Sequence, residues 1–131
     1  MDEGYSVYRL AVSFEEEEAV CAGEAVGRCL HTGDVVSFSG FPGALRVYPR
    51  EEWETLLKTP GLDKRLIRRL CMESAVIDVE GDSFYLPPMH AERAGLKEEA
   101  ALLVFPDGAR FLTGVSGAEA LAQRRQRQKK R

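Results

Sequence analysis

Alternation of apolar and polar residues near the start of the chain predicts a β-strand. Every second residue from Tyr8 to Phe14 is apolar, which is the period of a strand with one buried face. The acidic run Glu15–Glu18 is expected to turn the chain, and Ala19–Ala22 is expected to return it. The chain therefore opens with a predicted pair of strands.

A short helix and a second strand pair are expected next. The pattern predicts a helix over Glu24–Leu30 that stops near Gly33. Two apolar runs, Val35–Phe38 and Ala44–Tyr48, flank a Ser-Gly-Phe-Pro-Gly segment that is typical of a hairpin turn. Pro49 then favours the start of a helix, because the first helical position needs no N–H donor.

The second half of the chain shows the same order of predicted elements. They are strands at Ala75–Val79 and Ser83–Leu86, a short helix from Pro87 to Gly95, strands at Ala100–Phe105 and Ala109–Thr113, and a final helix that begins with a capping box at Ser116–Glu119. Each half reads as strand, strand, short helix, strand, strand, helix.

Residue identities also repeat between the halves. At a separation of 64 positions, Phe41-Pro42 aligns with Phe105-Pro106 and Arg46 aligns with Arg110. The order of elements and these matches together predict an internal repeat. We expect residues 1–60 and 74–123 to form the two half-repeats of one α+β domain.

The segment between the halves, residues 61–73, is predicted to be an amphipathic connector helix. Apolar residues fall on one side at helical spacing, and cations cover much of the other side. These cations are Lys64, Arg65, Arg68 and Arg69. Such a face is either simply solvated or available to bind an anionic partner.

Charge is concentrated at the carboxyl end of the chain. The formal net charge of the 131 residues is −3, but residues 124–131 carry no acid and six cations. The remaining residues hold 12 basic against 21 acidic side chains, so the rest of the chain is acidic. A basic tail attracts phosphates without regard to sequence, and a solvated helix extension is the alternative reading. The tail cations are Arg124, Arg125, Arg127, Lys129, Lys130 and Arg131.

Other classes of protein find little support in the sequence. No apolar run approaches the roughly 20 residues that span a bilayer, so we expect no membrane association and a cytoplasmic location. The three cysteines lack C-x-x-C spacing and are expected to be buried and reduced, without zinc or a disulfide. We assign no catalytic residue, metal or cofactor, because neither His31 nor His90 has a recognisable third orienting group.

Several segments resemble the MraZ family. They are Leu45–Glu54, Arg68-Arg69-Leu70 followed by Ser74-Ala75-Val76, and Leu86-Pro87-Pro88 followed by Glu92 and Ala94-Gly95-Leu96. The resemblance covers roughly residues 10 to 115. It implies two tandem AbrB-like swapped-hairpin half-repeats, DNA-binding transcriptional regulation in a bacterial cytoplasm or nucleoid, and homo-oligomers in the form of rings.

The chain departs from this family at the Asp-x-x-x-Arg signature that the family carries in each half. The first signature falls on Glu15 and Ala19, and the second falls on Asp78 to Asp82 or on Val79 to Ser83. Neither half therefore keeps the arginine, whose planar guanidinium suits phosphate or guanine recognition.

Two functions follow as expectations. The first is a DNA-associated transcriptional regulator that binds duplex through the connector helix and the tail, with the usual arginine readout lost. The alternative is a protein-interaction module on the same fold that regulates through a protein partner and does not bind DNA.

Overall fold

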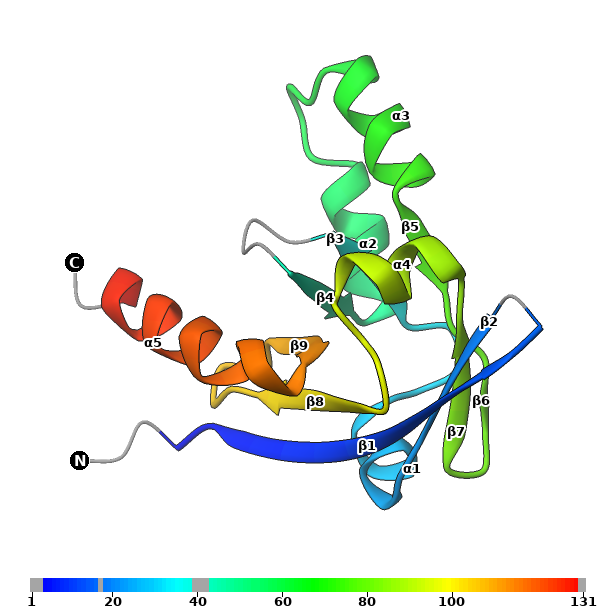
Figure 1. Ribbon diagram of the computed structural model, residues 1–131. Helices are drawn as coiled ribbons and strands as arrows, with labels where there is room; N and C mark the ends of the chain where they lie inside the picture. The colour runs from blue at the N-terminus through cyan, green and yellow to red at the C-terminus, as the bar shows by residue number, and fades with distance from the viewer. Residues whose placement is uncertain (1–3, 17, 39–42, 130–131) are drawn as a thin grey trace.

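The computed structural model describes residues 4–16, 18–38 and 43–129. These residues form a mixed α and β structure in which one curled antiparallel sheet carries helices on its faces and at one end (Figure 1). The fold class is therefore α+β, as the sequence predicts. None of the described helices is long and apolar enough to cross a membrane.

The strands within the described residues follow the predicted turns closely. They are β1 (Ser6–Glu15), β2 (Glu18–Ala22), β3 (Val35–Phe38), β4 (Ala44–Tyr48), β5 (Ser74–Val76), β6 (Val79–Glu80), β7 (Ser83–Leu86), β8 (Glu99–Val104) and β9 (Arg110–Gly114). The helices are α1 (Glu24–Cys29), α2 (Arg50–Leu57), α3 (Lys64–Met72), α4 (Pro88–Arg93), the 3-10 turn η1 (Val115–Gly117) and α5 (Ala118–Lys129).

Strands from the two halves of the chain alternate within the sheet. The order is β5-β3-β4-β9-β8-β1-β2-β7-β6. Strand β1 pairs with β8 from Ser6↔Val104 to Ala11↔Glu99, and with β2 from Ala11↔Ala22 onward. Because β1–β8, β2–β7 and β4–β9 each join the first half to the second, neither half can form its sheet alone.

The predicted single strand at Ala75–Val79 is wrong. It divides into β5, which pairs with β3, and β6, which pairs with β7 at the opposite end of the strand order. Between them the buried Ile77 bonds to a loop: its N–H donates to the Asp34 carbonyl at 2.9 Å, and its carbonyl accepts from Gly33 N–H at 3.0 Å. These loop bonds replace strand pairing where the chain crosses the sheet.

Two further expectations differ from the structure. Ser116 does not cap the last helix, because it lies inside η1 and α5 begins at Ala118. The three cysteines are free thiols, but only Cys21 is buried; Cys29 is half-buried and Cys71 is exposed on α3.

The core lies on both faces of the central strand β8. Ala100 and Leu102 point into the larger cluster, which includes apolar residues of α1 and α4. Ala101 and Leu103 point the other way, into a cluster covered by Leu121 and other residues of α5. A strand that is buried on both faces has a nearly continuous apolar sequence, as Glu99–Val104 does.

Candidate nucleic-acid interface

Local signals in the sequence form α3. The carboxylate of Asp63 accepts the backbone N–H of Arg65 at 2.9 Å, which is the hydrogen bond expected of an N-cap residue. At the other end, Arg69 Nε lies 3.8 Å from Glu73 Oε2, an i,i+4 ion pair across the last turn. Both ends of the helix are thereby stabilised by side chains of the segment itself.

Helix α3 stands out from the body of the molecule. It extends beyond the sheet together with α2, and its N-terminal end lies farthest from the sheet (Figure 1). None of its residues is buried. The helix therefore presents its side chains to solvent or to a partner.

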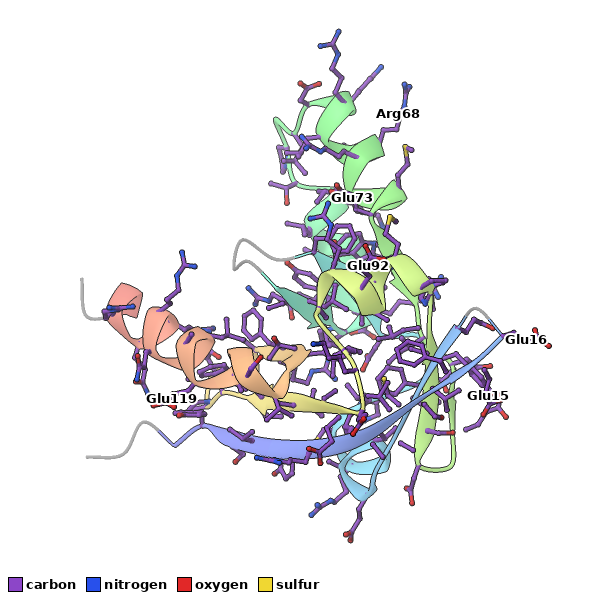
Figure 2. The ribbon with its side chains drawn as sticks, viewed as in Figure 1. Glu15, Glu16, Arg68, Glu73, Glu92 and Glu119 are labelled. Carbon is purple, nitrogen blue, oxygen red and sulfur yellow. The ribbon has the colours of Figure 1, made fainter. Side chains whose placement is uncertain are left out.

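The cations of α3 form a stripe along one side of the helix. We define the α3 stripe as Lys64, Arg65, Arg68 and Arg69. Residues three and four apart lie on the same face of a helix, so Arg65, Arg68 and Arg69 project from neighbouring turns. In Figure 2 the Arg68 side chain points away from the body into solvent.

Most of the α3 stripe has no counter-charge. Within the part of the chain that the structure describes, Lys64, Arg65 and Arg68 form no ion pair, and only Arg69 has an acidic partner. Cations elsewhere are engaged: Arg9, for example, lies 3.4 Å from Glu99. Unpaired cations that are clustered on a protruding helix give a local positive potential on an otherwise acidic protein.

The basic tail is less uniform than the sequence suggests. Arg125 is not a free cation, because its Nη2 donates to Asp107 Oδ2 at 2.7 Å and its guanidinium lies 4.6 Å from the centre of the Phe105 ring. Arg127 is exposed, and Arg124 is exposed but has a partner of its own. Lys129 lies in α5 with an undescribed side chain, and Lys130 and Arg131 lie outside the described residues.

The structure does not bring the two predicted basic segments together. Helix α3 projects from one side of the molecule, and α5 runs along another to the carboxyl terminus (Figure 1). The α3 stripe and the tail are thus two separate basic sites. Arg125 holds α5 to the body and does not belong to either.

The positions of the family's signature have structural roles here. Ala19 is fully buried in the larger core cluster, so an arginine at this position could not reach a partner without disrupting the core. Asp82 lies in the β6–β7 turn, where its backbone carbonyl accepts Gly23 N–H at 2.9 Å. The Ser83 hydroxyl donates to the Glu80 carbonyl at 3.1 Å, and Asp78 Oδ1 accepts from the Thr32 hydroxyl at 3.4 Å. Glu15 is exposed at the end of β1.

A buried ion pair joins the two halves and was not anticipated from the sequence. Arg110 Nη1 donates to Asp34 Oδ2 at 2.8 Å and to the Cys29 carbonyl at 2.7 Å. Both side chains are less than one-tenth exposed. The only signal in the sequence is an arginine within the otherwise apolar strand β9. The pair is structural, because its groups are satisfied by each other and by backbone.

The described residues offer little to a catalytic reading. Burial raises the pKa of the Cys21 thiol to about 12, so this residue stays protonated and is a poor nucleophile. His90 is buried, with Nε2 at 3.0 Å from the Glu73 carbonyl. Among the described residues, no three His, Cys, Asp or Glu side chains are grouped as metal ligands.

No protein-family model and no curated protein matches the chain.

Proposed function

We propose that this protein is a DNA-associated transcriptional regulator on an MraZ-like scaffold, and that it binds duplex through the phosphates. The observation that carries the proposal is the α3 stripe: four cations on an exposed, protruding helix, three of them without an acidic partner among the described residues. Lysine and arginine on such a helix are the groups that contact the DNA backbone.

The bounds of the elements support two half-repeats. Helix α1 covers residues 24–29 and α4 covers residues 88–93, so both ends differ by the 64 positions that align the sequence. Strands β3 and β8 begin 64 positions apart, and β2 and β7 end 64 positions apart. Matching elements at one constant separation are what tandem half-repeats produce.

The strand pairing supports the same scaffold. Exchanging each element with its counterpart turns the β3–β4 hairpin into β8–β9 and leaves the β2–β7 and β4–β9 pairs unchanged. Strand β1 pairs with both β8 and β2, and its counterpart is divided: β5 pairs with β3, and β6 pairs with β7. A pseudo-twofold domain made of two interlocked units has this symmetry of pairing.

The proposed binding is dominated by charge and not by base recognition. The signature positions hold Ala19, Asp82 or Ser83 where the family has arginine, and neither a buried alanine nor an acidic turn residue can read a guanine edge. The acidic remainder of the chain repels phosphate, so it orients the molecule with α3 toward the duplex. Contacts of this kind position a protein on DNA and give affinities that depend steeply on salt.

The test is fluorescence anisotropy on a mixed-sequence duplex, titrated across a range of salt concentration. The full chain is compared with R65A/R68A, and the matched control is R28A/K97A, which removes two cations from elsewhere on the surface. Each phosphate contact contributes about 0.9 to the slope of log affinity against log salt. We therefore expect R65A/R68A to lower the slope by roughly two, and the control to leave it unchanged.

A second variant separates the α3 stripe from the tail. Truncation after Gln126 removes Arg127 and the residues that follow but keeps Arg125, which packs on Phe105. Retention of most of the slope in this variant supports the proposal. Loss of all binding on truncation, with R65A/R68A unaffected, would refute it and would favour the protein-interaction module.

A further inference from the structure

An apolar patch lies where α4 begins, between the α3 stripe and the tip of the β1–β2 hairpin. Its members are Phe14, Met72 and Met89, which are 56%, 74% and 54% exposed. Large apolar side chains with more than half of their surface in solvent are unusual when they are grouped, and such groups mark interaction sites.

Hydrogen bonds and strand registers place these three residues around one point. The carbonyl of Glu73, which follows Met72, lies 3.0 Å from the ring Nε2 of His90, which follows Met89. The end of α3 and the start of α4 therefore touch.

The hairpin reaches the same point from the other direction. Phe14 pairs with Ala19, and Ala19 pairs with Leu86, the last residue before the proline that caps α4. Phe14 thus lies two strands from the start of α4.

The two margins of the patch carry opposite charge. On one side Met72 continues the line of Arg65 and Arg68 along α3, since the three residues are three or four positions apart. On the other side Phe14 is followed by Glu15, Glu16 and Glu18 at the hairpin tip, all of them exposed. Figure 2 shows Arg68 near one end of this side of the molecule, and Glu15 and Glu16 at the other end.

We infer that the patch is the interface of a two-fold dimer of this chain. A two-fold axis brings the same surface of both copies together, so the surface must be complementary to itself. A basic margin, an apolar centre and an acidic margin meet this condition: the acidic tip of each copy faces the α3 stripe of the other, while Phe14, Met72 and Met89 are buried at the centre. Methionine suits such a centre because its side chain adapts to the surface it meets.

The dimer stands without any DNA function, but one consequence rests on the proposed function. A second copy covers Arg65 and Arg68, so self-association and DNA binding compete for the α3 stripe. By mutual linkage, the dimer lowers the affinity for duplex, and duplex favours the monomer.

Sedimentation of the full chain over a wide range of concentration, without DNA, tests the dimer. We expect a monomer of 14.6 kDa in equilibrium with a species of twice that mass. The variants E15R/E18R and R65E/R68E each place like charges at both contacts, so each should raise the dissociation constant by more than about tenfold. The control E80R/E98R reverses two exposed acids away from the patch and should leave it unchanged.

Mixing makes the test specific to this geometry. In an equimolar mixture of E15R/E18R and R65E/R68E, both contacts of a two-fold pair again join opposite charges, so a heterodimer should form where neither variant associates alone. The four-fold variant that combines all these substitutions should recover its own dimer. Circular dichroism of each variant confirms that it is folded.

Three results would overturn the inference. One is a monomer at every concentration. Another is association that E15R/E18R leaves unchanged. The last is an assembly larger than two chains, which would indicate a head-to-tail contact. None of these results bears on DNA binding, which is measured separately on the α3 variants.

Discussion

The buried pair of Arg110 and Asp34 gives the sharpest prediction about stability. In the structure Asp34 Oδ2 accepts from Arg110 Nη1 at 2.8 Å and from the His31 N–H at 2.9 Å. Substitution Asp34→Ala removes both acceptors and leaves a guanidinium inside the protein with only the Cys29 carbonyl as a partner. An uncompensated buried charge is the expected cause of destabilisation.

The magnitude follows from the burial of both partners. Their side chains are 9% and 5% exposed, so solvent screens the pair weakly. Breaking a pair of this kind by removing one partner costs about 3–5 kcal/mol, whereas replacing both partners by apolar groups costs far less. Since domains are stable by roughly 5–15 kcal/mol, Asp34→Ala should remove a third or more of the total.

The assay is a double-mutant cycle in urea. The free energy of unfolding is measured for the natural chain, Asp34→Ala, Arg110→Met and the double variant. We expect each single substitution to cost at least about 2 kcal/mol and the double variant to be no worse than the poorer single, because it leaves no unpaired charge. Additive costs, with a coupling energy below about 0.5 kcal/mol, would show that the two groups do not stabilise each other and would refute the reasoning.

Three other predictions concern a thiol, a glycine and the dimer patch. With a disulfide reagent near pH 8, the exposed Cys71 should react at once, but Cys21 should react only on unfolding; its pKa of about 12 keeps it protonated below that pH, and fast reaction of Cys21 in the folded protein would contradict this. Gly114→Ala should lower the free energy of unfolding by about 1–3 kcal/mol, because a Cβ there would lie 2.6 Å from the backbone oxygen of Gly95; urea titration measures the loss, and an unchanged midpoint would contradict the close approach. Met89→Glu should abolish the dimer and leave duplex affinity, measured by anisotropy, equal to or above that of the natural chain; a large loss of affinity would contradict the competition for the α3 stripe.

Local elements could be predicted from the sequence because their signals are local. The strands Val35–Phe38, Ala44–Tyr48 and Ser83–Leu86 have the predicted bounds, since β-branched and aromatic runs end at glycine and proline turns. Helix α3 lies within the predicted connector for a similar reason: Asp63 caps it and its cations and apolar residues alternate at helical spacing.

Long-range pairing could not be predicted in the same way. The division of the Ala75–Val79 segment depends on Ile77, which bonds to the loop at Gly33 and Asp34, more than 40 positions away in the chain. The same limit applies to Arg125, which the sequence groups with the tail although Asp107 and Phe105 hold it against the body. Composition counts charges, but it does not say which of them are already paired.

The position of α3 in the proposed repeat bears on how function and fold are divided. Under the 64-residue repeat, α1 corresponds to α4 and the strands of each half have counterparts, but residues 61–73 have none. Strand pairing between the halves fixes the repeated elements, so substitutions there disturb the sheet, as the burial of Ala19 illustrates. The unmatched helix has no buried residue and can change its surface at little cost to folding. It is the segment in which the chain carries unpaired cations, and we infer that DNA contact has moved from the repeated loops of the family to this helix.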